Sequence, residues 1–287
     1  MDIGIGLPNS ITGTTGRQVL DWAQRAEQRG FSTLATVGAV SYPSYEELTV
    51  LGAAAAVTER IRLMTNVLIA PARSAAELAK QAATVDQLSN GRLALGLGVG
   101  WRDADYVLTG RSFDDRGAHF DELLGGLQTA WSGKALVDGT RPPAPRPAQS
   151  TGVPLMIGGG TDDAIRRVVE HGIGYTAGGL PPDAVAEMID RVQKAWTEAG
   201  RQGRPRFAAL AYFGLGDTED RSRETLLDYY APRGEEMATM IADSALRSPD
   251  AIRGAVAAFA DVGVDDLILD PTVSDVEQVD LLADVVL

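Results

Sequence analysis

Two glycine-rich segments have the composition of a phosphate-binding site. Gly158-Gly159-Gly160-Thr161-Asp162 follows an apolar run and opens a stretch with helical spacing, and Gly178-Gly179 follows the next apolar run. Free N–H groups and the positive dipole end of a helix favour an anion, and glycine lets the backbone approach it closely. Glycine also serves in tight turns between a strand and a helix, so the first segment alone favours neither reading. The second segment favours the phosphate site.

A third glycine-rich segment, Gly96-Leu97-Gly98-Val99-Gly100-Trp101, only superficially resembles a dinucleotide-binding fingerprint. The residues after it, Arg102-Asp103-Ala104-Asp105-Tyr106, show no clear helix start, and the acidic residue expected about 20 positions further on has no strand to occupy. The small residues Gly98 and Gly100 more plausibly leave a flat wall beside a planar ring.

Hydrolytic and metal-dependent chemistry have little support in the residue types. No Gly-x-Ser-x-Gly motif is present, and neither His119 nor His171 lies near such a motif. The absence of cysteine excludes a thiolate nucleophile, a disulfide, an iron–sulfur cluster and a Cys-ligated zinc. Among 39 acidic residues a glycosidase pair is conceivable, but nothing singles one out. We assign neither histidine a catalytic role.

The elements that would position these segments alternate between short apolar β-rich runs and longer runs with helical spacing. This alternation is typical of βα units on a parallel sheet. The strands are expected at Ile3 to Leu7, Thr33 to Val37, Ile61 to Ile69, Leu93 to Leu97, Leu155 to Ile157, Gly174 to Ala177, Arg206 to Phe213 and Asp266 to Leu269. An open doubly wound sheet is the alternative, but eight units favour a single-domain (β/α)8 TIM barrel over residues 1–287.

Two segments interrupt the alternation. Arg141 to Thr151 contains four prolines and is expected to form an extended surface connection. Thr218 to Ala245 is acidic and is expected to form a helical insertion after strand seven, with a role as a lid as one interpretation.

Charge and hydropathy narrow the partners. With 39 acidic and 26 basic residues the formal charge is −13, which would repel nucleic acid and anionic membranes. No run of about 18 apolar residues and no signal-peptide pattern is visible, so we expect a cytoplasmic protein that does not bind a membrane. The mix of 45% hydrophobic and 23% charged residues is that of an ordinary globular protein.

Three segments together resemble the luciferase-like family of flavin- or deazaflavin-dependent oxidoreductases. They are Thr58 to Leu63 leading to Thr65-Asn66-Val67, Ser89-Asn90-Gly91-Arg92-Leu93 running into Gly96 to Trp101, and Leu155-Met156-Ile157-Gly158-Gly159-Gly160. The most specific stretch is Thr58 to Trp101, and the resemblance covers nearly the whole chain.

The resemblance implies a (β/α)8 barrel that binds flavin mononucleotide (FMN) or the deazaflavin coenzyme F420 at the carboxyl ends of its strands. The cofactor ring would lie against a bulge at the end of strand three, with a non-proline cis peptide at Asn66-Val67. The phosphate would contact the N–H groups of Gly159, Gly160 and Thr161, with Gly178 and Gly179 alongside.

One departure from the family leaves the catalytic residues unassigned. Many deazaflavin-using members carry an acid and a histidine after strand two, where this chain reads Val37-Gly38-Ala39-Val40. Asp105 stands where many relatives have glutamate and is interpreted as structural. The remaining polar side chains expected near the substrate are listed here: Asn9, Tyr42, Arg102 and Tyr212.

The leading functional hypothesis is an oxidoreductase that uses reduced FMN to activate dioxygen or to pass hydride to a small organic substrate, with a separate flavin reductase as a candidate partner. The alternative is a deazaflavin enzyme, whose acidic cofactor tail would need basic residues such as Arg73, Arg102 and Arg233. A non-catalytic ligand-binding barrel is the alternative of another class. The family resemblance also implies a homo-oligomer, for which Leu51 to Val57 offers an apolar face.

Overall fold

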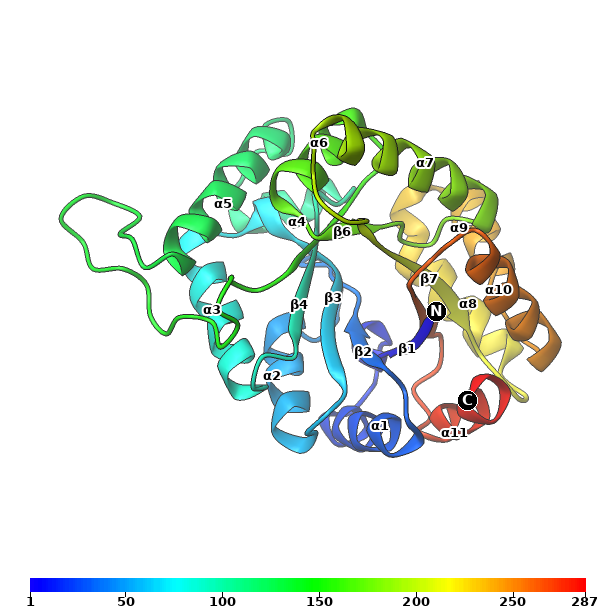
Figure 1. Cartoon of the computed structure of the whole chain (residues 1–287). Coiled ribbons are helices and arrows are strands. Elements are labelled where there is room, and N and C mark those ends of the chain that lie inside the picture. Colours follow the sequence, from blue (N-terminus) through cyan, green and yellow to red (C-terminus); the bar gives the residue numbers. More distant parts are fainter.

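The computed structural model describes all 287 residues and forms a closed barrel of eight parallel strands (Figure 1). Each strand pairs with the next one in the chain, and β8 closes the barrel by pairing with β1. The (β/α)8 prediction is confirmed, and the open doubly wound alternative is wrong. The strands are β1 Asp2–Gly6, β2 Thr33–Thr36, β3 Arg62–Ile69, β4 Leu93–Gly98, β5 Leu155–Gly158, β6 Gly174–Thr176, β7 Arg206–Phe213 and β8 Asp266–Pro271.

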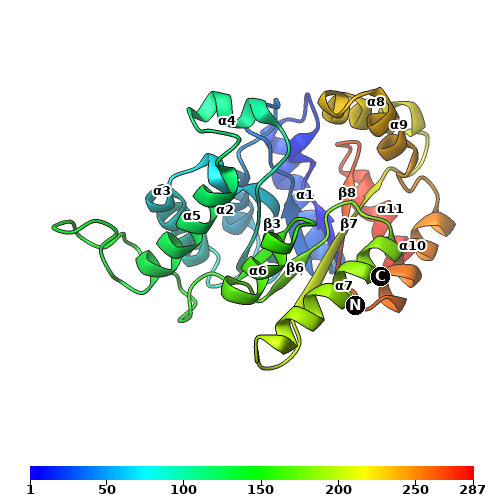
Figure 2. The same ribbon diagram turned by 90° about the horizontal axis from the view of Figure 1, so that it is seen from above.

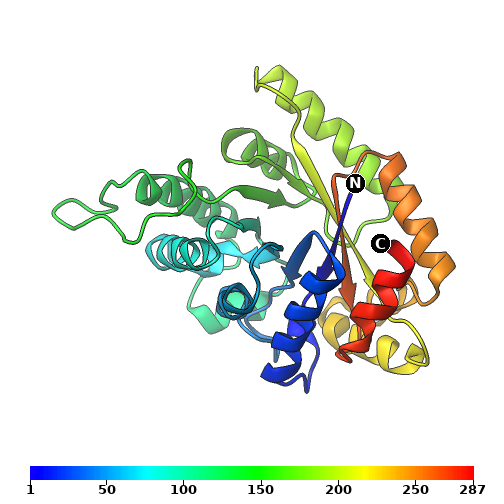
Figure 3. The same cartoon turned by 60° about the horizontal axis from the view of Figure 1, so that its bottom comes forward.

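Helices surround the barrel, and α11 lies beside α1 and α10 so that the outer ring closes (Figure 3). None of the helices is both long enough and apolar enough to cross a membrane. The α-helices are α1 Gly16–Arg29, α2 Glu47–Val57, α3 Ala75–Leu88, α4 Asp103–Thr109, α5 Arg116–Trp131, α6 Asp162–His171, α7 Pro182–Glu198, α8 Glu219–Tyr230, α9 Glu235–Asp243, α10 Pro249–Asp261 and α11 Glu277–Val286. Short 3-10 helices occupy η1 Pro8–Ser10, η2 Ala70–Ala72 and η3 Ala231–Arg233.

Local sequence signals account for several helix ends. Thr15 and Gln18 form a capping box at the start of α1, and Gly30 ends that helix with a φ of 93°. The predicted stop after α3 is also present, since Asn90 and Gly91 both adopt positive φ.

Helix α4 corrects the prediction that no helix starts after the fourth strand. The cap residue Arg102 makes no side-chain hydrogen bond to the helix, which is why the usual start signal is missing. Instead, the negative charges of Asp103 and Asp105 in the first turn interact favourably with the positive end of the helix dipole. The fully buried Tyr106 packs against Ile69 and donates a hydrogen bond to the Val99 carbonyl at 2.5 Å. Tertiary packing therefore stabilises a helix that local sequence does not indicate.

The two interruptions of the alternation have different structures. Residues 132–154 contain neither helix nor strand, are mostly exposed, and project from the ring beside α3 and α5, as the proline-rich sequence predicted (Figure 1). Between β7 and α10 the chain forms α8, η3 and α9. These helices lie at the same end of the barrel as α4, opposite the end that carries the N-terminus (Figure 2).

The barrel interior is divided by an apolar layer. Its members, all buried, are Ala35, Met64, Met156, Ala208 and Ile268. A larger core fills the space between the strands and the helices. Leu51, Ala54 and Ala55 of α2 belong to that larger core, so much of the apolar stretch considered for oligomerisation packs inside the molecule.

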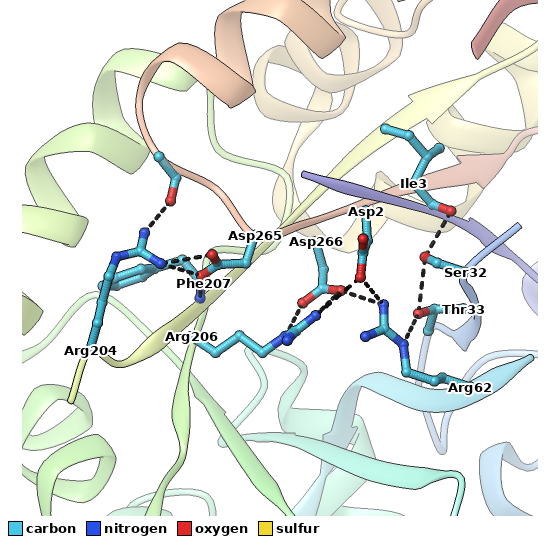
Figure 4. Close-up of polar contacts among 11 residues, drawn as sticks. Asp2, Ile3, Ser32, Thr33, Arg62, Arg204, Arg206, Phe207, Asp265 and Asp266 are labelled. Atoms are coloured by element: carbon cyan, nitrogen blue, oxygen red, sulfur yellow. Dashed lines mark hydrogen bonds and ion pairs between the residues drawn. The ribbon is translucent and has the colours of Figure 1, made fainter. Parts of the chain in front are cut away.

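Below the apolar layer, the end of the barrel nearest the N-terminus carries a paired charge cluster (Figure 4). Asp266 accepts hydrogen bonds from Arg62 and Arg206, each at 2.8 Å, and Asp2 pairs with both arginines. A cavity of about 270 Å³ adjoins these residues. Because every charged group here has a partner, and because the functional end of such barrels is the opposite one, we interpret this cluster as structural.

Candidate active site

Above the apolar layer, at the carboxyl ends of the strands, three buried polar side chains form what we call the mouth floor: Asn66, Thr176 and Asp270. Asn66 and Asp270 lie two positions after the apolar-layer residues Met64 and Ile268, so strand alternation turns them toward the barrel interior. Thr176 donates a hydrogen bond from Oγ1 to Asn66 Oδ1 at 2.6 Å. This bond orients the Asn66 amide nitrogen away from Thr176.

The end of β3 carries the predicted bulge. The peptide bond Asn66–Val67 is cis, and the pairing register between β3 and β4 shifts between Thr65 and Leu68. Both features confirm the sequence-based expectation. The Val67 side chain fits against glycine, because a Cβ on Gly98 would lie 2.9 Å from Val67 Cγ2 and a Cβ on Gly158 would lie 3.3 Å from Val67 Cγ1.

Gly100 has a similar role one step along the chain. Its φ is 65°, and a Cβ there would lie 2.8 Å from Ile69 Cδ1. Gly98 and Gly100, which were predicted to lie beside a planar ring, therefore leave space for the side chains of β3.

The mouth floor contains polar atoms without protein partners. Asn66 Nδ2 and both carboxyl oxygens of Asp270 are buried and form no hydrogen bond. The Asp270 side chain fills the space beside Gly6, where a Cβ would lie 1.5 Å from Asp270 Oδ1. Burial raises the pKa of the Asp270 carboxyl well above its ordinary value. Since buried polar groups in proteins are normally paired, this arrangement fits a site that receives a polar ligand.

The glycine-rich segment after β5 presents an exposed backbone at the start of α6. Gly159, Gly160 and Thr161 are all exposed, and Gly159 has a φ of 124°. Thr161 caps the helix by accepting the Ala164 N–H at 3.2 Å. Gly178, at the end of β6, has a φ of 61° and no atom near its missing Cβ. The arrangement leaves room for an anion at the start of α6.

Arg191 of α7 adds a positive charge beside this helix start. Its guanidinium donates to the Gly160 carbonyl at 3.2 Å and pairs with Asp162 at 2.7 Å. Sequence reasoning missed Arg191, because it lies 31 positions from Gly160 and only the packing of α7 against α6 brings the two together.

Aromatic side chains gather over the mouth in what we call the aromatic cluster: Tyr42, Trp101, Tyr212, Tyr229 and Tyr230. The Trp101 and Tyr230 rings stack with centroids 6.0 Å apart, and the Tyr42 and Tyr229 rings meet edge to face at 4.8 Å. The Tyr212 and Tyr230 hydroxyls are hydrogen-bonded at 2.7 Å. Helix α8 supplies Tyr229 and Tyr230 and so covers this side of the mouth.

Three of the four predicted pocket residues join this cluster. Tyr212 and Tyr42 are members, and the buried Arg102 guanidinium lies 4.1 Å from the Tyr229 ring centroid and donates to the Tyr229 carbonyl. The fourth residue, Asn9, is positioned elsewhere. Its amide donates to the Val37 carbonyl at 2.9 Å and accepts the Val37 N–H at 3.3 Å, so it fastens the loop after β1 to the end of β2.

Two further carboxylates support the loop after β2. Asp105 accepts hydrogen bonds from the Ser41 N–H at 2.7 Å and the Ser41 hydroxyl at 2.6 Å. Glu47 is buried, which raises the pKa of its carboxyl, and it pairs with Arg73 at 2.6 Å. Arg73 also pairs with Glu46 at 2.8 Å. These pairings give Asp105 and Arg73 structural roles.

Sequence reasoning also missed Asp270, Thr176 and the Tyr229–Tyr230 pair. Asp270 had a readable signal, because an acidic residue directly follows the apolar run Leu267 to Leu269 at a strand end. Thr176 lies in a strand of only three residues, which is too short for alternation to indicate which side chains point inward. No local pattern distinguishes the tyrosine pair from the other residues of an acidic helix.

The sequence has relatives among curated proteins. An uncharacterised protein of Mycobacterium tuberculosis (strain ATCC 25618 / H37Rv) is 32% identical over 169 residues, which are 56% of this chain and 59% of that protein. The FMNH2-dependent dimethylsulfone monooxygenase of Pseudomonas putida is 24% identical over 230 residues, which are 75% of this chain and 62% of that enzyme. The chain thus spans about three fifths of the length of these relatives.

Solved structures share the fold over its full length. Monooxygenase RslO1 from Streptomyces bottropensis has a TM-score of 0.80 with 21% identity, covering 100% of this chain and 98% of that one. An F420-dependent secondary alcohol dehydrogenase in complex with an F420-acetone adduct has a TM-score of 0.80 with 18% identity, covering 99% and 98%. At these identities the likeness concerns the fold alone.

The family assignment rests on the sequence as a whole. Residues 1–284 match the family described as luciferase-like monooxygenase. The bulge at Asn66–Val67, the glycine-rich strand ends and the mouth floor all lie within this range. This chain belongs to the luciferase-like monooxygenase family.

Proposed function

We propose that this protein is an oxidoreductase that binds reduced FMN at the barrel mouth and acts on a small organic substrate. The observation that carries the proposal is the mouth floor, where the buried Asn66 amide nitrogen and Asp270 carboxyl lack protein partners beside the bulge of β3. Buried donors and acceptors without partners are costly, so a polar ligand that satisfies them would be bound favourably.

The residues present fit the two ends of such a cofactor. Gly159, Gly160 and Thr161 would hold the phosphate at the start of α6, with Gly178 and Gly179 alongside, and Arg191 would exchange its ion pair with the exposed Asp162 for one with the phosphate. The bulge at Asn66–Val67 would support the ring. Reduced FMN supplies either hydride or the activation of dioxygen, and the protein orients and shields it.

The protein's own contribution is to shield the site and to orient the ligand. The aromatic cluster and α8 lie over the mouth and would keep water from the reacting atoms. The Tyr212 and Tyr230 hydroxyls would offer the substrate hydrogen bonds from this side. A separate reductase would supply the reduced cofactor.

Deazaflavin F420 is the second candidate, and the rim arginines bear on it. Of the three arginines considered for its acidic tail, Arg73 is paired with Glu46 and Glu47, and Arg102 is buried in the aromatic cluster. Arg233 alone is exposed, 5.1 Å from the Trp101 ring centroid. A single unpaired arginine, Arg233, would bind the acidic tail of F420 less well than the start of α6 would bind the one phosphate of FMN. We therefore favour FMN.

The test compares the binding of oxidised FMN, riboflavin and F420 by quenching of their fluorescence. We expect FMN to bind more tightly than riboflavin, which lacks the phosphate, and we expect Arg191→Ala to narrow that difference. Arg253→Ala removes an exposed arginine of α10 and serves as the control. Tighter binding of F420 would favour the deazaflavin enzyme, and binding of none of the three would favour a non-catalytic ligand-binding barrel.

A further inference from the structure

The Asp270 carboxyl is buried without a hydrogen bond or an ion pair to offset its desolvation. The residue is 2% exposed, ends the inward-facing row of β8, and lies directly above Ile268 of the apolar layer. Neither oxygen accepts a hydrogen bond, and no arginine, lysine or histidine forms an ion pair with it. A carboxylate without a partner in such surroundings is strongly disfavoured, so the neutral acid is the favoured form.

The titratable groups that face Asp270 are tyrosines. Tyr212 is its register partner on β7 and points to the same side of the sheet, while Tyr229 and Tyr230 approach from α8. Burial raises the pKa of all three hydroxyls, and an ionised Asp270 would raise them further. On β1 the neighbour is Gly6, whose lack of a side chain makes the space that Asp270 occupies.

The Tyr212–Tyr230 pair begins beside this carboxyl, because Tyr212 is the register partner of Asp270 on β7. The two hydroxyls are 2.7 Å apart, and both residues are only half-buried, unlike Asp270. Either hydroxyl can donate to the other, so a proton can pass along the pair without movement of the backbone.

We propose that Asp270 is the proton-transfer group of this site and that Tyr212 and Tyr230 restore its proton. The inference rests on the proposed function, in which reduced FMN supplies the electrons. The O–H bond of the Asp270 carboxyl breaks, a new O–H bond forms on the substrate oxygen that has gained electron density, and a carboxylate remains. The Tyr212 hydroxyl then turns to donate its proton to the carboxylate, takes a proton from the Tyr230 hydroxyl, and Tyr230 regains its own from water.

This role also selects a class of substrate. Once Asp270 has given up its proton, an acidic substrate would leave two negative charges side by side without a basic partner, whereas a neutral carbonyl or hydroxyl group accepts the Asp270 hydrogen bond and adds no charge. The geometry therefore points to a neutral substrate, with one oxygen function directed at the mouth floor and an apolar or aromatic body against the aromatic cluster.

The first test needs no cofactor. The free energy of unfolding is measured against pH for the wild type, for Asp270→Asn and for Asp250→Asn, an exposed control that removes one carboxyl from α10. Because the folded-state pKa of Asp270 lies above the unfolded value, the stability of the neutral acid is lost as pH rises between these two values. In this interval the ratio of the wild-type unfolding constant to that of Asp270→Asn should increase about tenfold for each pH unit.

The second test measures proton exchange with a bound ligand. Oxidised FMN is added in weak buffer with a pH indicator, at a pH above the folded-state pKa of Asp270 found in the first test, where its carboxyl is ionised, and proton uptake is compared between the variants. A ligand atom that accepts a hydrogen bond from Asp270 favours its protonated form, so we expect uptake by the wild type, by Asp250→Asn and by Tyr212→Phe, and none by Asp270→Asn. Tyr212→Phe should take up the proton more slowly.

The outcomes separate this inference from the proposed function. If the wild type binds FMN and Asp270→Asn shows the same proton uptake and the same pH dependence of unfolding, the role of Asp270 is refuted while the proposed function stands. If the wild type binds neither FMN nor F420, both fail. With any substrate that the wild type converts, Asp270→Asn should lower kcat by about 10²- to 10⁴-fold and change KM less.

Discussion

The hydrogen bond between Thr176 and Asn66 joins β6 to the bulge of β3 and can be removed by a single substitution. Thr176→Val keeps the shape of the side chain and deletes the hydroxyl that donates to Asn66 Oδ1 at 2.6 Å. Thr176 is 1% exposed and Asn66 is 4% exposed, so water does not replace the lost donor. The Asn66 amide would then be free to rotate, although its nitrogen is the atom that the proposed ligand meets.

The expected size of the effect follows from this burial. Leaving a buried acceptor without a donor costs about 1 to 3 kcal/mol of unfolding free energy. For a chain of this length, each kcal/mol lowers Tm by roughly 2 °C. If about 1.4 kcal/mol of the orienting energy is also lost from the bound state, the Kd for FMN rises about tenfold.

The assay pairs thermal and urea unfolding with FMN binding, and the chain offers a matched control. Thr65 is equally buried, and its hydroxyl donates to the Gly96 carbonyl at 2.8 Å within the same barrel. Thr65→Val should lose similar stability and keep its affinity for FMN. The reasoning is refuted if Thr176→Val loses stability but binds FMN as tightly as the wild type, or if both variants lose affinity equally.

Three further substitutions test other parts of the structure. Gly98→Ala places a Cβ 2.9 Å from Val67 Cγ2, so we expect about 1 to 3 kcal/mol of destabilisation in urea unfolding, together with weaker FMN binding. Gly125→Ala, inside α5 with no atom near the new Cβ, should raise stability by about 0.5 to 1 kcal/mol, and an unchanged or lower Tm would contradict this. Hydrogen bonds from Arg167 hold the pKa of Asp121 below its ordinary value, so Asp121→Asn should be less stable than the wild type at neutral pH, and the difference should vanish as pH falls through the folded-state pKa.

The fold could be predicted because its signals are local and repeated. Apolar runs of strand length, helical spacing and stops such as Gly30 and Asn90-Gly91 recur along the chain outside residues 132–154. The bulge at Asn66–Val67 came from the family resemblance, not from any physical pattern in the residues. Helix α4 escaped prediction because its stability comes from the burial of Tyr106 and not from a capping residue.

The site could be predicted only where glycine marks a strand end. Arg191, Thr176 and Tyr230 act through neighbours that are distant in sequence, such as the 110 positions between Thr176 and Asn66. Composition and periodicity cannot predict these side-chain contacts, because the contacts depend on the stagger of neighbouring strands and on the path of α8. Asn9 shows that a polar side chain after a strand need not face the site, because its hydrogen bonds can instead hold the neighbouring loops together.

The two inward-facing aspartates of β8 differ in their pairing, and the difference favours the carboxyl end of the barrel as the end that would receive a ligand. Asp266 and Asp270 lie four positions apart on the same face of one strand, with Ile268 between them. Asp266 is paired with Arg62 and Arg206 (Figure 4), whereas the Asp270 carboxyl has no hydrogen-bond or ion-pair partner. A chain able to pair one carboxylate twice could have paired the other, and an unpaired buried acid lowers stability. Under the proposed role of Asp270, this cost falls at the end of the barrel where a proton would be exchanged, and it would serve no purpose at the opposite end.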